Sequence, residues 1–203
     1  MGYYIRVLGT SNPNIHIDEL ERALSRSGLT AKFEIDPTET KDNWTTVEVS
    51  NFAGNCLIQI ERNHVVDGAL GKEELEEFRE DIKYYKPNSA VKWLLNYFNN
   101  VKVVYAFQIL HETKSEDDWK IIDSVRARIL ANTGGITQAD SEGFSNESGF
   151  HILWQFSDDV EGEYDMAVKN FFGNWTNFRM DLGDLKQREE FWKGKVPRGA
   201  KKL

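Results

Sequence analysis

The segment Val101–Leu110 constrains the fold more than any other part of this sequence. Its residues, Val-Lys-Val-Val-Tyr-Ala-Phe-Gln-Ile-Leu, place apolar side chains at both odd and even positions. Since successive side chains of a strand point to opposite faces, this run predicts a strand that is covered on both sides. We therefore expect it at the centre of a sheet.

Patterns of period two and of period 3.6 surround this strand along the whole chain. In the segment 115–133, Ser115 and Asp118 have the spacing of a capping box, and Trp119, Ile122 and Val125 belong to the predicted buried stripe. The other strands are predicted at 3–8, 31–35, 44–52, 55–62, 136–142, 150–156 and 175–182, and the other helices at 17–27, 72–85, 91–98, 164–172 and 185–192.

This order of elements predicts an α+β fold of mixed or antiparallel sheets with helices on one face. The order strand, helix, strand, strand, helix, strand is that of a ferredoxin-like fold. We expect two such halves, 1–100 and 101–203, as a pseudo-repeat that could also form one continuous domain. Ser50-Asn51 with Gly54 matches Ser145-Asn146 with Gly149, although ordinary turn chemistry can produce the same match.

Charge and composition limit the classes of partner. The 203 residues include 33 acidic and 25 basic residues, for a net charge of −8. Binding to a phosphate backbone depends on Lys and Arg, so we expect no nucleic acid partner. No run approaches 18 apolar residues, the N-terminus lacks a basic leader, and Cys56 is the single cysteine. We expect a soluble, cytoplasmic protein without disulfides and without a membrane partner.

One stretch carries the residue types of a catalytic or ligand site. Asp140 and Glu142 would share one face of a strand, and His151 could approach them from the neighbouring strand. Two carboxylates and an imidazole could hold a divalent metal or perform acid–base catalysis. The alternative interpretation is a polar strand end that faces solvent before a turn.

No nucleotide, hydrolase or metalloprotease motif occurs in the chain. The sequence contains no GxGxxG, GxxxxGK[ST], GxSxG or HExxH, and its four histidines lie far apart. We therefore expect no cofactor and no metal, and an enzyme is the less favoured class.

An acidic helix face is the strongest indication of a partner. Because Leu75, Phe78 and Ile82 define the buried side of the helix predicted at 72–85, its carboxylates fall on the opposite side. Such a surface attracts a basic protein, which favours a non-enzymatic binding module of the immunity or antitoxin type that occludes its partner. The expected contact residues are Glu73, Glu76, Glu77, Glu80 and Asp81. The oligomeric state stays open. The competing hypothesis is an enzyme or small-ligand binder that uses Asp140, Glu142 and His151.

Overall fold

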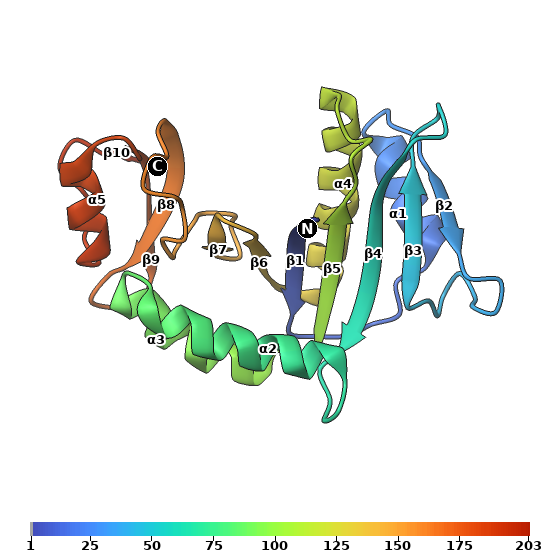
Figure 1. Cartoon of the computed structure of the whole chain (residues 1–203), viewed down its shortest axis with the longest axis horizontal. Helices are drawn as coiled ribbons and strands as arrows, with labels where there is room; N and C mark the ends of the chain where they lie inside the picture. The colour runs from blue at the N-terminus through green and yellow to red at the C-terminus, as the bar shows by residue number, and fades with distance from the viewer. Residues whose placement is uncertain (1) are drawn as a thin grey trace. The chain divides into compact units, whose positions relative to one another are not determined.

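The computed structural model describes residues 2–203 and confirms an α+β fold. Within these residues it contains five α-helices, two short 3-10 helices and ten strands in antiparallel sheets (Figure 1). The chain forms two compact units, each assembled from segments that are not consecutive. Unit 1 comprises residues up to 72 and 101–135, and unit 2 comprises 73–100 and 136–203. The division into halves 1–100 and 101–203 stays a prediction.

Unit 1 is an antiparallel sheet with two helices on one face. Its five strands run in the order β2-β3-β4-β5-β1. The apolar run identified in the sequence is β5, which pairs with β4 on one side and with β1 on the other and is buried over its first five residues. The bounds are β1 (Tyr3–Gly9), β2 (Lys32–Ile35), β3 (Thr46–Ser50), β4 (Cys56–His64), β5 (Val103–Ile109), α1 (Ile17–Arg26) and α4 (Glu116–Thr133).

Helices α1 and α4 contact each other and lie behind the sheet in Figure 1. Leu20 and Leu24 of α1 are buried together with Ile122, Val125 and Ile129 of α4. The capping box predicted for α4 is present, with Ser115 as N-cap. Trp119, predicted in the buried stripe, is instead 37% exposed, because Asp118 and Ile121 complete the inward face of α4.

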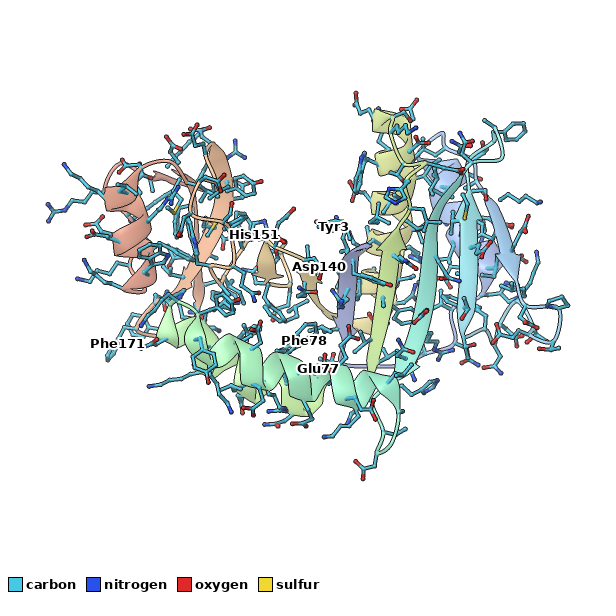
Figure 2. All side chains as sticks on the ribbon, viewed as in Figure 1. Tyr3, Glu77, Phe78, Asp140, His151 and Phe171 are labelled. Atoms are coloured by element: carbon cyan, nitrogen blue, oxygen red, sulfur yellow. The ribbon has the colours of Figure 1, made fainter. Side chains whose placement is uncertain are left out.

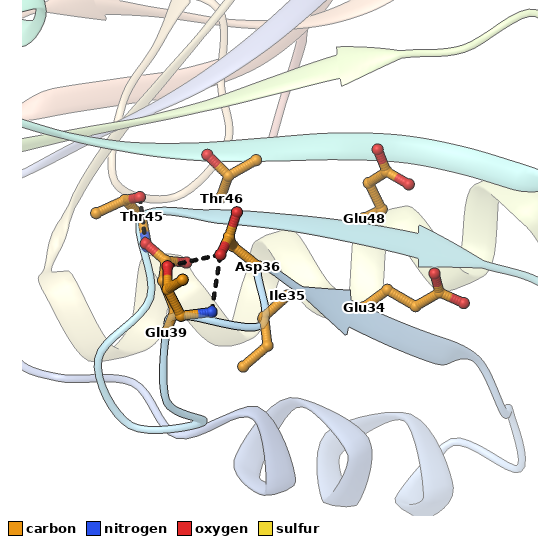
Figure 3. Close-up of a pocket in the computed structure, with 8 residues that line it drawn as sticks. Glu34, Ile35, Asp36, Glu39, Thr45, Thr46 and Glu48 are labelled. Atoms are coloured by element: carbon orange, nitrogen blue, oxygen red, sulfur yellow. Dashed lines mark hydrogen bonds between the residues drawn. The ribbon is translucent and has the colours of Figure 1, made fainter.

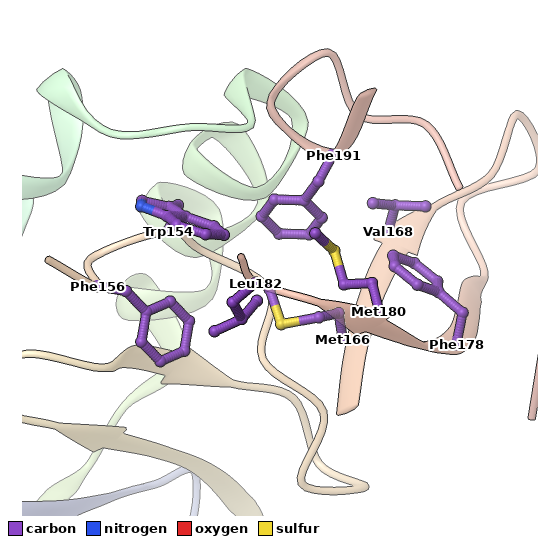
Figure 4. Close-up of a cluster of buried hydrophobic side chains, with 8 residues drawn as sticks. All are labelled: Trp154, Phe156, Met166, Val168, Phe178, Met180, Leu182 and Phe191. Atoms are coloured by element: carbon purple, nitrogen blue, oxygen red, sulfur yellow. The ribbon is translucent and has the colours of Figure 1, made fainter. Parts of the chain in front are cut away.

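Unit 2 contains most of α2, the helix α3, and the elements that follow α4. A three-stranded sheet of order β10-β9-β8 packs against α5 through a cluster of buried aromatic and methionine side chains, which includes Met166, Phe178 and Phe191 (Figure 4). The bounds are α2 (Leu70–Asp81), a 3-10 turn (Ile82–Tyr84), α3 (Asn88–Tyr97), a second 3-10 turn (Phe98–Asn100), β6 (Gly135–Ala139), β7 (Gly143–Ser145), β8 (Glu163–Lys169), β9 (Trp175–Asp181), α5 (Leu185–Trp192) and β10 (Lys201–Lys202).

The structure corrects the predicted helix at 164–172. This segment is strand β8, which pairs with β9 over seven residues and ends in a hairpin. Tyr164, Met166 and Val168 alternate along the strand, and this period of two is typical of a strand and not of a helix. Without that helix, the second half does not follow the ferredoxin-like order, and the pseudo-repeat is not confirmed.

Two other strands differ from the prediction. The segment 150–156 forms only isolated bridges, since its backbone bonds are divided among three parts of the chain: 144–146, 165–167 and Lys86. The strand predicted at 136–142 ends at Ala139, because a tight turn at 140–142 leads directly into β7. At the C-terminus, Lys201 and Lys202 pair with β9.

Candidate functional site

The acidic residues of α2 lie on its exposed side, as the sequence predicts. Leu75 is buried, and Phe78 contacts Phe98 and Phe144 at ring-centroid distances of 6.4 and 5.4 Å. These contacts direct the other side of the helix outward, and Figure 2 labels Glu77 there. Glu73, Glu76, Glu77, Glu80 and Asp81 are all exposed.

Only part of this acidic charge is neutralised by neighbouring cations. Lys83 Nζ lies 2.6 Å from Glu80, and Arg79 Nε lies 3.7 Å from Glu76. Glu73 and Glu77 form no ion pair or side-chain hydrogen bond within residues 2–203. Two carboxylates of this face are therefore available to a cation from outside the chain.

A shallow groove of about 560 Å³ follows the same face. Tyr84, at the end of the 3-10 turn after α2, forms one wall and is 85% exposed. Sequence reasoning missed this tyrosine, although its place at the end of an acidic amphipathic helix is a usable signal. The surface of the groove is almost entirely apolar, because the acidic residues of this face line it with their aliphatic stems beside the Tyr84 ring. It therefore suits the stem of a Lys or Arg side chain whose charged end reaches the carboxylates at the rim. Its lining residues are Glu76, Glu77, Glu80, Asp81 and Tyr84.

The structure brings Glu142 and His151 close together, as the competing hypothesis expects. His151 Nε2 lies 4.0 Å from a Glu142 carboxylate oxygen, and its Nδ1 lies 3.3 Å from the Ser145 hydroxyl. The sequence identifies Ser145 only as a turn residue and not as a member of this site. Asp140 and Glu142 belong to the turn between β6 and β7, so they are not on one strand face as predicted.

His151 lies among aromatic rings. Its ring centroid lies 5.3 Å from that of Phe156 and 5.7 Å from that of Tyr164. Burial lowers the pKa of His151, against the opposing effect of the Glu142 and Asp165 carboxylates. Burial therefore favours the neutral form of the imidazole.

A second acidic surface lies in unit 1 and was not predicted. A pocket of about 540 Å³ is bordered by Glu34 and Glu48, which face each other directly across β2 and β3 (Figure 3). Asp36 accepts hydrogen bonds from the backbone and hydroxyl of Thr38. Alternation in the sequence places Glu34 and Glu48 on solvent-facing positions, but their pairing depends on the register of the strands.

The remaining observations concern metals, membranes and relatives. Among residues 2–203, no group of three His, Cys, Asp or Glu side chains is arranged to hold a metal ion. In the same residues, every helix is too short or too polar to cross a bilayer. No protein-family model, curated protein or solved structure matches the chain.

Proposed function

We propose that this chain is a protein-binding module that occludes a basic partner protein through the exposed acidic face of α2. The observation that carries the proposal is the pair of unneutralised carboxylates, Glu73 and Glu77, beside the groove formed with Tyr84. An immunity or antitoxin-type inhibitor works in this way when it covers the functional surface of a cytoplasmic partner.

The carboxylates of this surface would attract a basic partner electrostatically. A group of carboxylates on one face raises the rate of encounter with a cationic surface, and the effect weakens as salt screens the charges. Pairs that form at the rim change the association rate more than the dissociation rate. Tyr84 adds an aromatic contact of the kind that is enriched at binding hot spots.

A charge-reversal experiment tests the proposal. The double variant Glu73→Lys/Glu77→Lys keeps helix propensity, because Glu and Lys are similarly good helix formers. With the partner recovered from source cells and then purified, we expect at least a tenfold lower association rate and a weaker dependence on salt. Stopped-flow or surface-binding kinetics between about 50 and 300 mM salt measure both quantities.

The matched control changes net charge by the same amount elsewhere. Asp117 and Asp123 are exposed on α4, and Asp117→Lys/Asp123→Lys should alter association far less. Equal kinetics for the two double variants would show that α2 is not the contact surface.

The approach of Glu142 to His151 supports a second candidate, an acid–base enzyme or small-ligand binder. If Asp140, Glu142 and His151 form such a site, then Asp140→Ala/Glu142→Ala should abolish the hydrolytic activity or small-ligand binding that wild type shows in a screen of generic substrates and ligands. Unchanged behaviour of this variant would remove the second candidate.

A further inference from the structure

Three hairpin loops of this chain share one hydrogen-bonding pattern. In each, the first residue is an asparagine whose side-chain oxygen accepts from the backbone N–H groups two and four residues later. In each, the fourth residue is a glycine with φ between 80° and 86°, a conformation that other residues avoid. The loops are Asn51–Asn55, Asn146–Phe150 and Asn170–Asn174.

The two positions between asparagine and glycine are free to vary. They are Glu147 and Ser148 in the second loop but Phe171 and Phe172 in the third. Because the same loop forms with polar residues, its geometry does not require the two phenylalanines. Their side chains are nevertheless 98% and 84% exposed, with ring centroids 5.7 Å apart. Two adjacent exposed aromatic rings contribute nothing to the core of this chain.

Lys169 connects the base of this loop to two neighbouring elements. Lys169 Nζ donates a hydrogen bond of 2.8 Å to the Gly173 carbonyl and lies 4.3 Å from the Trp175 ring centroid. The same amine lies 5.1 Å from the ring centroid of Trp93 on α3. The base of the loop thus contacts both β9 and α3, which limits the backbone freedom that the loop loses on binding.

We propose that Phe171 and Phe172 form a hydrophobic anchor that inserts into an apolar cleft of the same basic partner protein. This inference rests on the proposed function and extends it, since α2 supplies attraction at a distance and the loop supplies the contact that slows dissociation. Both features belong to unit 2, and Figure 2 labels Phe171 and Glu77 on the lower side of that unit.

The area of the two rings and the charge of α2 favour a basic protein over a second copy of this chain or a lipid surface. Two phenylalanine side chains can bury at most about 500 Å². Two identical loops that meet would therefore bury at most about 1,000 Å². This is less than the roughly 1,600 Å² that a stable specific interface buries in total, so the loops alone would not hold a dimer. Anionic lipid would repel the carboxylates of α2. A protein with an apolar cleft beside basic residues can bind both features, because the cleft takes up the aromatic rings and the basic residues pair with the acidic face.

Photocrosslinking followed by kinetics tests the proposal. The full chain carries p-benzoylphenylalanine at position 171, at position 77 or, as a control, at position 52 and is irradiated in extract of the source cells. We expect positions 171 and 77 to capture one and the same basic protein, identified by mass spectrometry. Crosslinked peptides from position 171 should be apolar.

That protein, purified, then serves as the kinetic probe. Phe171→Ala/Phe172→Ala should raise its dissociation rate at least tenfold and change its association rate less than twofold. Phe52 is 91% exposed at the corresponding position of the first loop, so Phe52→Ala is the matched control with no expected effect. Thermal unfolding should be the same for all three proteins, because the removed rings are exposed.

The outcomes separate this inference from the proposed function. If Phe171→Ala/Phe172→Ala behaves like Phe52→Ala while Glu73→Lys/Glu77→Lys still slows association, the anchor is wrong and the acidic docking surface stands. Capture of lipid, of nucleic acid or of nothing at position 171 also overturns the anchor. If position 77 captures nothing, both proposals fail.

Discussion

Asp118 is a structural carboxylate that joins a helix to a hairpin within unit 1. Its side chain accepts hydrogen bonds from Asn51 Nδ2 at 2.9 Å and from the backbone N–H of Ser115 at 2.9 Å. Asn51 in turn organises the β3–β4 loop through its side-chain oxygen. These donors favour the ionised carboxylate and lower the pKa of Asp118 to about 2. One residue therefore stabilises two elements.

Removing this carboxylate should destabilise the protein measurably. We expect Asp118→Ala to lower the free energy of unfolding by about 2 kcal/mol at pH 7, because a helix cap and a partly buried hydrogen bond are lost together. Urea denaturation followed by circular dichroism measures the change. The neighbouring Asp117→Ala, which removes an exposed carboxylate, should cost less than about 0.5 kcal/mol.

The same carboxylate should contribute to acid unfolding. The folded pKa of Asp118 lies below the ordinary value of 3.8, so its ionisation favours the folded state above about pH 4. This contribution is lost as the pH falls from about 4 towards 2. Wild type should therefore lose more stability than Asp118→Asn over that interval. If the free energy of unfolding of the two proteins changes equally with pH over that interval, Asp118 does not make this contribution.

Strand β8 shows how a hairpin is specified by its turn and its partner together. Asp165 and Arg179 form a two-pronged ion pair across β8 and β9, with N–O distances of 2.6 and 2.9 Å. At the other end, Asn170 and Gly173 close the loop. The side chains on one face of the hairpin join the cluster of buried residues around Phe191 (Figure 4).

The asparagine of this loop should be replaceable only by another side-chain acceptor. Asn170→Ala removes the oxygen that accepts two backbone N–H groups, and we expect it to cost about 1 kcal/mol of unfolding free energy. Asn170→Asp keeps an acceptor and should stay within about 0.5 kcal/mol of wild type. Chemical denaturation of wild type and both variants measures the free energy of unfolding. Equal losses of this free energy in the two variants would show that the side-chain oxygen does not stabilise the loop.

At the scale of the whole molecule, long-range strand pairing joins the first strand to a segment in the middle of the sequence. In unit 1, β5 pairs with β4 and with β1, so residues 103–109 complete a sheet that begins at residue 3. Helix α4 then supplies Ile122, Val125 and Ile129 to the same core. A cut at residue 100 would separate the central strand from both of its neighbours.

Fragment expression tests the consequence. We expect fragment 1–100 to remain unfolded alone, because it lacks the central strand and α4. Co-expression with fragment 101–203 should restore a cooperative transition, because both partners of β5 are then present. The chemical-shift dispersion of amide signals in nuclear magnetic resonance spectra shows whether the separate and the co-expressed fragments are folded. A folded spectrum from fragment 1–100 alone would support independent halves.

Local patterns in the sequence were sufficient for the elements whose stabilising contacts are local. The capping box at Ser115, the acidic face of α2 and the alternating strands of unit 1 were predicted because each depends on residues a few positions apart. The match between the loops at Asn51 and Asn146 also has a local cause, since a third loop at Asn170 repeats the pattern.

Only the tertiary structure decided features that depend on which strand pairs with which. The segment 164–172 became a strand because β9 lies beside it, and the approach of Glu142 to His151 depends on a turn and a bridge that no local pattern encodes. The pairing of Glu34 with Glu48 has the same origin. Side-chain periodicity reports which face of an element is buried, whereas register and neighbours are set by packing between residues far apart in the chain.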